Sequence, residues 1–182
     1  MIKITIIENE KLQPIQWDGG LTYEYFIYPE NAKYKDKNFD FRISCATIEK
    51  TPAVFTQFKG YNRYLMMLDN ELIISRNQLE EAYAQHQIFD FDSNDHILSY
   101  SKGNDFNLMV SNQQFVTQML FFKGKVILRS KWIILFATTQ TNVRVNDINY
   151  CLNQKDCLII YNIDNQKVRI DVMQSILKIE IN

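Results

Sequence analysis

The chain has few of the residues from which disulfide frameworks and metal centres are built. Its 182 residues include three cysteines and two histidines. Cys45, Cys151 and Cys157 are odd in number and form no C-x-x-C pair, which favours reduced thiols over disulfides or a zinc site. His86 and His96 lie in polar surroundings, as is typical of surface histidines. We therefore expect no metal and no cofactor.

An excess of charge of one sign and a long apolar run are also missing. Lys and Arg number 20 and Asp and Glu number 21, so the net charge of -1 creates no broad field for nucleic acid or an anionic membrane. No segment approaches the roughly 18 consecutive apolar residues of a membrane span. The start of the chain lacks the charged-then-apolar layout of a signal peptide. These features predict a cytoplasmic protein without nucleic-acid or membrane partners.

The common catalytic motifs are absent as well. The sequence contains no G-x-S-x-G elbow, no Walker loop and no G-x-G-x-x-G turn. Open transition-metal sites are commonly built from a cluster of histidines with a carboxylate. His86 and His96 are the only histidines of the chain and lie ten positions apart in polar surroundings, which does not suggest such a cluster. The sequence therefore does not match a standard enzyme.

Short strand-like runs make up most of the chain. They cover residues 2–6, 22–28, 41–48, 63–68, 72–75, 106–110, 126–128, 132–138, 143–145, 157–161, 168–172 and 179–181. Lys123-Gly124 and Asn165-Gln166 are turn signals between runs, and only residues 77–87 and 112–120 have a helical spacing. This pattern predicts an all-β sandwich or barrel. Without a linker, residues 1–182 are expected to form a single domain, although the two strand-rich halves leave open two sheets or two barrel units.

Polar residues interrupt several of these runs at period two. In residues 41–48, alternation places Arg42 and Ser44 on one face and Phe41 and Ile43 on the other. The same rule pairs Thr22 with Glu24, Tyr61 with Arg63, and Asp105 with Asn107. Four strand segments can therefore each turn a polar pair towards the interior of a barrel.

Two arginines in such an interior would need partners. Burying a lone charge costs several kcal/mol, so Arg42 and Arg63 call for carboxylates, and Glu24 and Asp105 are the internal candidates. A guanidinium that stays partly free binds a ligand carboxylate through two parallel hydrogen bonds. The alternative is that both arginines are exposed on solvated faces or held in structural ion pairs.

Several blocks of the sequence follow a recognisable pattern. They are Trp17-x-Gly19-Gly20-x-Thr22-x-Glu24, Arg42-x-Ser44-x-Ala46-x-Ile48, Phe55-Thr56-x-Phe58-x-Gly60-Tyr61-x-Arg63 and Asp105-Phe106-Asn107-Leu108-Met109. Their order and spacing resemble the signature of the HutD/Ves family. The match is closest over residues 14–110, and the rest of the chain resembles the family in its β-rich character.

The resemblance implies a cupin-like (RmlC-like) β-barrel, with a two-barrel (bicupin) arrangement as an extension of that fold. It also implies a protein that is commonly a homodimer and lacks the metal ligands of enzymatic cupins. Some family members are associated with histidine utilisation, where sensing of urocanate or formylglutamate has been proposed, and others with stress. These candidate ligands share a carboxylate, in agreement with the arginine argument.

We expect a non-catalytic protein that binds a small organic acid or regulates a pathway. Arg42 and Arg63 would contact the acid, and Glu24 and Asp105 would orient the arginines. The expected hydrogen-bond partners are Thr22, Ser44 and Asn107. Phe58 and Tyr61 are further candidate ligand-binding residues, whose rings would stack on the ligand. The alternative is that these two residues and Phe106 are core or rim aromatics.

Two alternatives to this function stay open. One is a metal-independent isomerase, lyase or hydrolase that acts on a small carboxylate with Glu24 or Asp105 as general base. It requires a carboxylate without an arginine partner and with a perturbed pKa, whereas simple binding predicts that both carboxylates are paired. The other is an interaction protein, which an obstructed pocket would favour.

Overall fold

The computed structural model describes residues 1–112 and 117–182, and its regular structure is almost entirely β. Two 3₁₀ helices, η1 (Asn9–Lys11) and η2 (Tyr34–Asp36), interrupt the strands. None of the helices in this part of the chain is long and apolar enough to cross a membrane. Contacts divide the chain into a first unit, residues 12–112, and a second unit, residues 1–11 with 117–182. The predicted all-β class is confirmed.

The first unit contains two antiparallel sheets. The larger sheet has the strand order β2-β3-β4-β11-β6-β9, and the smaller has the order β5-β10-β7-β8. The strands are β2 (Ile15–Trp17), β3 (Gly20–Tyr28), β4 (Phe41–Ile48), β5 (Ala53–Val54), β6 (Tyr61–Met67), β7 (Leu72–Arg76), β8 (Leu79–Tyr83), β9 (Phe89–Asp92), β10 (Ile97–Ser99) and β11 (Gly103–Ser111). Leu65 and Phe89 of the larger sheet pack with Leu72 and Ile97 of the smaller sheet in one apolar cluster. This cluster fills part of the space between the sheets.

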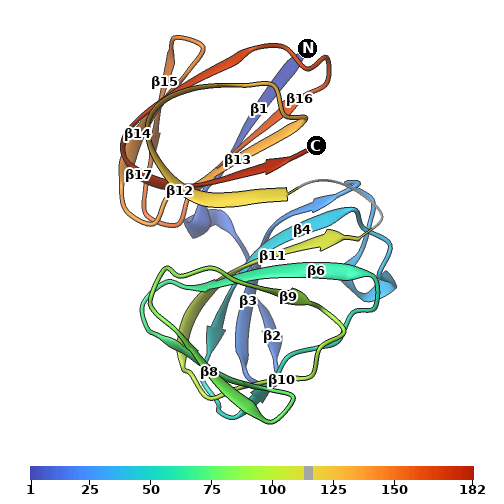
Figure 1. The fold of residues 1–182 in the computed structure, drawn as a ribbon. Helices are drawn as coiled ribbons and strands as arrows, with labels where there is room; N and C mark the ends of the chain where they lie inside the picture. The colour runs from blue at the N-terminus through green and yellow to red at the C-terminus, as the bar shows by residue number, and fades with distance from the viewer. Residues whose placement is uncertain (113–116) are drawn as a thin grey trace. The chain divides into compact units, whose positions relative to one another are not determined.

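The second unit is one curled sheet, with β1 from the start of the chain beside β16 (Figure 1). Its strand order is β1-β16-β13-β17-β14-β15, and β12 pairs along β17. The strands are β1 (Ile2–Ile7), β12 (Thr117–Leu128), β13 (Trp132–Phe136), β14 (Thr141–Val145), β15 (Ile148–Leu152), β16 (Cys157–Asn162) and β17 (Val168–Ile181). Its buried core includes side chains from strands β13, β14, β16 and β17, among them Ile133, Val143, Leu158 and Ile170.

Two expectations about local structure are wrong. Residues 77–87 are not helical, because Asn77 and Gln78 form a tight turn with φ of 53° and 70° and are followed by β8. Positive φ at both central residues suits the twist of a hairpin, and this turn overrides the weak helical spacing. Lys123-Gly124 is not a turn between strands but lies within β12, at an irregularity of the β12–β17 ladder.

The helical spacing of residues 112–120 is only partly testable. Residues 113–116 lie outside the described part of the chain, and residues 117–120 belong to β12.

Gly20 allows β3 to begin close to β4. It has a φ of 154°, and a Cβ atom there would lie 2.1 Å from the carbonyl oxygen of Thr47. We expect Gly20→Ala to lower the free energy of unfolding by more than about 2 kcal/mol, because neither backbone can retreat without breaking the ladder. Urea denaturation measures this loss.

Gly60 provides the matched control for this substitution. Its φ of 88° is also positive, but nothing lies within 4 Å of a Cβ atom built there. Gly60→Ala should therefore lower the free energy of unfolding by only about 1 kcal/mol, because only the unfavourable backbone conformation of a non-glycine residue contributes. Equal losses at the two glycines would contradict the close approach of Gly20 to Thr47.

Candidate ligand-binding site

Three of the four polar pairs predicted from the sequence, and Arg63 of the fourth pair, meet at one cavity of the first unit. Met109 of β11 lies opposite both Arg42 of β4 and Arg63 of β6, and Asn107 lies opposite Ser44. Residues directly opposite one another point to the same face of a sheet, so the three strands direct these side chains to a common space. The cavity has a volume of about 240 Å³. Of the nine predicted site residues, seven line it: Thr22, Glu24, Arg42, Ser44, Arg63, Asp105 and Asn107.

Arg42 is held firmly on one side of the cavity. Its Nε donates to Oε2 of Glu24 at 2.7 Å, and its Nη1 donates to Oγ of Ser44 at 2.9 Å. The guanidinium carbon lies 4.3 Å from the centre of the Tyr34 ring, within the range of a cation–π contact. Only 6% of the Arg42 side chain is exposed. Within the described residues Nη2 has no hydrogen bond, so this edge of the guanidinium is available to a ligand.

Arg63 is buried but held more loosely. Its Nε donates to Oδ1 of Asn107 at 3.3 Å, and its Nη1 donates to the Thr56 carbonyl at 3.4 Å. No carboxylate of the described residues forms an ion pair with it. Burial lowers the pKa of Arg63, because the surroundings do not replace the lost hydration of the charged group. An anionic ligand would supply the missing countercharge.

Asp105 does not form the ion pair expected for it. Its Oδ1 accepts a hydrogen bond from the backbone N–H of Ala46 at 3.0 Å, because Asp105 and Ala46 are opposite one another in the β11–β4 ladder. Among residues 1–112 and 117–182 no arginine lies within ion-pair distance of this carboxylate. Burial raises its pKa to about 6, since the charged form loses hydration. Glu24, by contrast, has the expected arginine partner.

Three aromatic residues of the wall, Trp17, Tyr34 and Phe55, were missed as site residues. Trp17 lines the cavity, and its indole N–H is buried without a hydrogen-bond partner in the described part of the protein. A Cβ atom at Gly19 would lie 2.2 Å from the Trp17 ring, so the ring needs a glycine at this position. The Trp17-x-Gly19-Gly20 block could therefore have indicated that Trp17 packs at a specific place. Tyr34 lies in the three-residue helix η2, which is too short to show a periodic pattern in the sequence. Phe55 and Thr56 complete the part of the wall next to Arg63.

The chain matches one known protein family over most of its length. The family model HutD matches residues 9–177, which is most of the sequence. The chain belongs to the HutD family. The resemblance recognised in its sequence blocks is thereby confirmed. A comparison with curated proteins finds no match.

Solved structures share the fold of this HutD-family chain. HutD from Pseudomonas fluorescens SBW25 (formate condition) is 20% identical, covers 99% of this chain and 98% of its own, and has a TM-score of 0.85. The conserved protein of unknown function PA5104 from Pseudomonas aeruginosa PAO1 is 19% identical over 99% of both chains, with a TM-score of 0.84. A cupin 2 conserved barrel domain protein from Leptotrichia buccalis is 10% identical over 98% and 96% of the two chains, with a TM-score of 0.62. These likenesses confirm the cupin-like fold.

Two predicted site residues lie outside the cavity wall of this HutD-family chain. Phe58 and Tyr61 pack with Phe39 and Met109 in a buried cluster. The Tyr61 hydroxyl donates to the Phe39 carbonyl at 2.8 Å. Their contacts match the core interpretation of these aromatics.

The three cysteines are free thiols, and they form no metal site within the described residues. Cys45 and Cys157 are buried free thiols, and Cys151 is exposed. Burial raises the pKa of the Cys157 thiol. Among the described residues, no group of three or more His, Cys, Asp or Glu side chains could hold a metal ion.

A larger hollow of about 460 Å³ lies on the second unit. Its charged side chains are mostly exposed to solvent. Arg169 pairs with Asp147 at 3.0 Å, and 65% of the Arg169 side chain is exposed. Lys125, which is 83% exposed, lies 3.9 Å from Asp171. Exposed pairs of this kind are worth little because water and salt screen them. The smaller cavity of the first unit, whose wall includes the buried Arg42 and Arg63, is therefore the better candidate.

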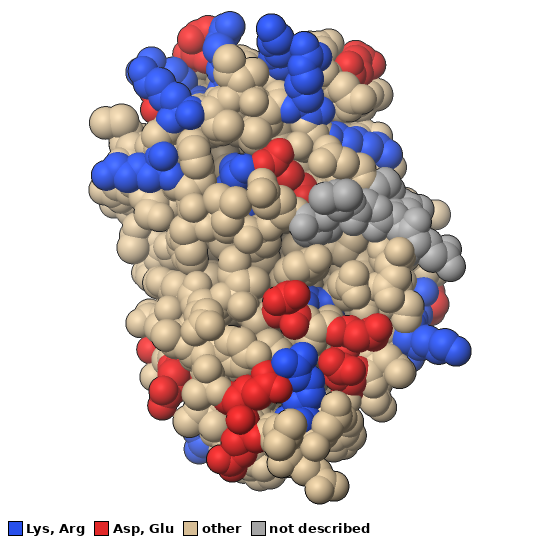
Figure 2. Space-filling model, viewed as in Figure 1, with Lys and Arg blue, Asp and Glu red and all other residues tan. Residues whose placement is uncertain are grey.

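Charge on the first unit does not favour anions at long range. Residues 12–112 contain 14 Asp and Glu against 9 Lys and Arg. Asp and Glu side chains gather on the face of this unit seen in Figure 2. An anionic ligand must therefore be recognised at short range, by the buried arginines.

Proposed function

We propose that this protein binds a small organic acid in the first-unit cavity and acts as a non-catalytic binding or regulatory protein. The observation that carries the proposal is the presence of two buried guanidinium groups, Arg42 and Arg63, at one cavity. The Nη2 group of each has no hydrogen bond within the described residues. Guanidinium groups recognise carboxylates through paired, charge-assisted hydrogen bonds, which makes a carboxylate the expected ligand group.

The dimensions of the cavity support a small acid. Its volume of about 240 Å³ lies below the roughly 300–1,000 Å³ of typical drug-sized sites. Ser44, Asn107 and Thr22 add neutral polar groups to the wall. Formate, urocanate and formylglutamate are the probe acids that we choose, because the family resemblance implies a link to histidine utilisation. The related HutD from Pseudomonas fluorescens SBW25 is described for a formate condition.

A thermal-shift screen tests this proposal. We expect at least one probe acid at millimolar concentration to raise the melting temperature by several degrees, because a ligand that binds only the folded state stabilises it. Formamide is the neutral control for formate and should produce no shift. If no small carboxylate stabilises the protein, organic-acid binding at this cavity is wrong.

A metal-independent enzyme is the second candidate, and Asp105 is the observation that favours it. This buried carboxyl has no arginine partner within the described residues, and its pKa of about 6 is suited to a general base near neutral pH. Proton NMR of each probe acid incubated with the protein separates the two functions. Binding alone leaves the spectrum of the free acid unchanged, whereas turnover produces new resonances that disappear in Asp105→Asn.

A further inference from the structure

We infer that Phe91 and Phe89 position Arg63 for ligand binding. The four side chains form a stack in the order Arg63, Phe91, Phe89 and Arg76. This inference rests on the proposed function only for its effect on ligand affinity, because the orientation of Arg63 can be measured without a ligand. Phe91 and Phe89 belong to β9, and neither lines the cavity. Their role would be to hold a binding residue in place.

The hydrogen bonds of Arg63 are too long to fix its guanidinium alone. They measure 3.3 and 3.4 Å, compared with 2.7 and 2.9 Å for those of Arg42. Typical N–H···O distances lie between about 2.7 and 3.2 Å. The guanidinium carbon of Arg63 lies 5.2 Å from the ring centres of both Phe55 and Phe91. Two aromatic faces therefore provide the contacts that define its plane.

The β6–β9 ladder explains why Phe91 is suited to this role. Arg63 and Phe91 are directly opposite one another, and Leu65 and Phe89 form the next pair on the same face. The rings of Phe89 and Phe91 are stacked, with centres 4.5 Å apart and planes inclined by 14°. Phe91 is 6% exposed and Phe89 is 1% exposed, so neither ring has room to turn away.

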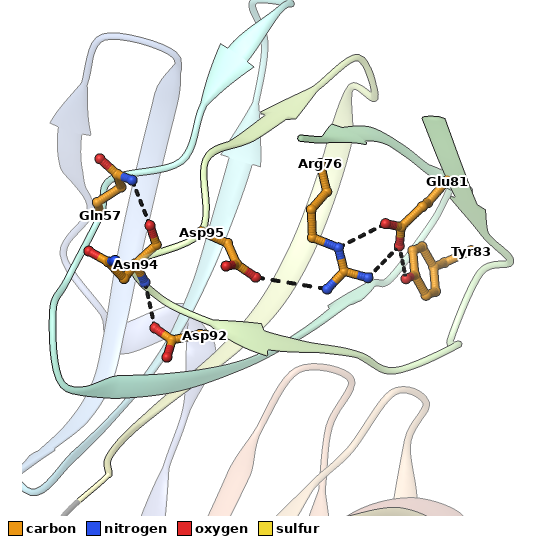
Figure 3. Close-up of polar contacts among 7 residues, drawn as sticks. All are labelled: Gln57, Arg76, Glu81, Tyr83, Asp92, Asn94 and Asp95. Carbon is orange, nitrogen blue, oxygen red and sulfur yellow. Dashed lines mark hydrogen bonds and ion pairs between the residues drawn. The ribbon is translucent and has the colours of Figure 1, made fainter. Parts of the chain in front are cut away.

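Figure 3 shows the polar cluster that closes the other end of the stack. The guanidinium carbon of Arg76 lies 5.3 Å from the centre of the Phe89 ring. Nε and Nη2 of Arg76 donate to the two carboxylate oxygens of Glu81 at 2.8 and 2.7 Å, and the Tyr83 hydroxyl donates to the same carboxylate. Asp95 lies 3.9 Å from Nη1. A bidentate pair of this kind fixes the plane of Arg76 against Phe89.

Hydrogen bonds at the turn after β9 also connect to the segment of Phe55, the second aromatic neighbour of Arg63. The side-chain amide of Gln57 donates to the Asn94 carbonyl at 2.6 Å, and the Asn94 N–H donates to Asp92 at 2.8 Å (Figure 3). This links the turn after β9 to the segment that carries Phe55 and Thr56, the remaining neighbours of Arg63. Both aromatic neighbours of the Arg63 guanidinium are thus tied to one turn.

The first test needs no ligand. In the NMR spectrum of isotope-labelled protein, we expect a single, slowly exchanging Nε–H resonance of Arg63 in the wild type and in Phe91→Tyr, which keeps the ring. Phe91→Leu should broaden the resonance or speed its exchange at least tenfold, and leave the Arg42 resonance unchanged. Leu72→Ala, which empties space in the same apolar cluster without touching Arg63, is the control for general loosening. An unchanged Arg63 resonance in Phe91→Leu would overturn the inference.

The second test measures affinity for the probe acid that gives the largest thermal shift. Phe91→Leu should weaken binding by roughly 5- to 30-fold, the range of a desolvated cation–π contact, and Phe91→Tyr by less than about threefold. In an Arg63→Ala background the substitution Phe91→Leu should have no further effect. An equal loss with and without Arg63 would assign Phe91 a purely structural role. If no acid binds the wild type, the proposed function fails, while the Arg63 resonance still decides whether Phe91 positions this side chain.

Discussion

Arg42→Ala is expected to abolish binding of small carboxylates, with affinity falling by roughly 100-fold or more. Loss of one member of a buried, hydrogen-bonded charge pair typically costs about 2–5 kcal/mol of binding free energy. The substitution removes the guanidinium and leaves Glu24 at the cavity without its cation. An incoming carboxylate then meets a negative group in place of a positive one. Isothermal titration calorimetry with formate and urocanate measures the loss.

Two controls show whether the loss is specific. Arg144→Ala removes an exposed arginine of the second unit and should leave affinity unchanged. Arg42→Lys keeps the charge but not the paired donors, and should recover only part of the affinity. Affinity within threefold of the wild type in folded Arg42→Ala would show that this arginine does not contact the acid.

Ligand affinity should fall by roughly 10- to 30-fold between pH 5 and pH 7.5, because Asp105 ionises at the same cavity. The pKa of Asp105 is about 6, so the carboxyl is mostly protonated at pH 5 and mostly charged at pH 7.5. A charged Asp105 repels a carboxylate ligand, whereas the protonated form can donate a hydrogen bond to it. Calorimetry across this pH range measures the effect, and Asp105→Asn should remove most of it.

The same group links pH to the stability of the ligand-free protein. A carboxyl with a higher pKa in the folded state than its ordinary 3.8 binds its proton more tightly when folded. Its contribution to stability is therefore greatest at low pH and is lost as pH rises from about 4 to about 6. As pH rises from 5 to 7.5, the free energy of unfolding of Asp105→Asn should increase by about 1 kcal/mol relative to that of the wild type. A constant difference between the two proteins would contradict a raised pKa at Asp105.

Local sequence pattern predicted much of the fold and part of the candidate site. The run Phe41–Ile48 is a strand with the expected bounds, because alternating polar and apolar residues suit a strand with two different faces. The predicted pairs Arg42–Ser44 and Asp105–Asn107 lie at one cavity, since period two puts both members of a pair on one face. Short strands such as β5 and β10 were missed, because two or three residues carry no measurable period.

By itself, the sequence determined the all-β class, the membership of the HutD family and the side chains that share a face, because these depend on local alternation and on blocks of adjacent residues. Only the tertiary structure decided which partners meet at the cavity. Tyr34 covers Arg42 from a 3₁₀ helix, and Phe91 lies opposite Arg63. Asp105 bonds the backbone of β4 in place of an arginine. Strand order and register bring together residues that are far apart in the chain, and no local pattern encodes either.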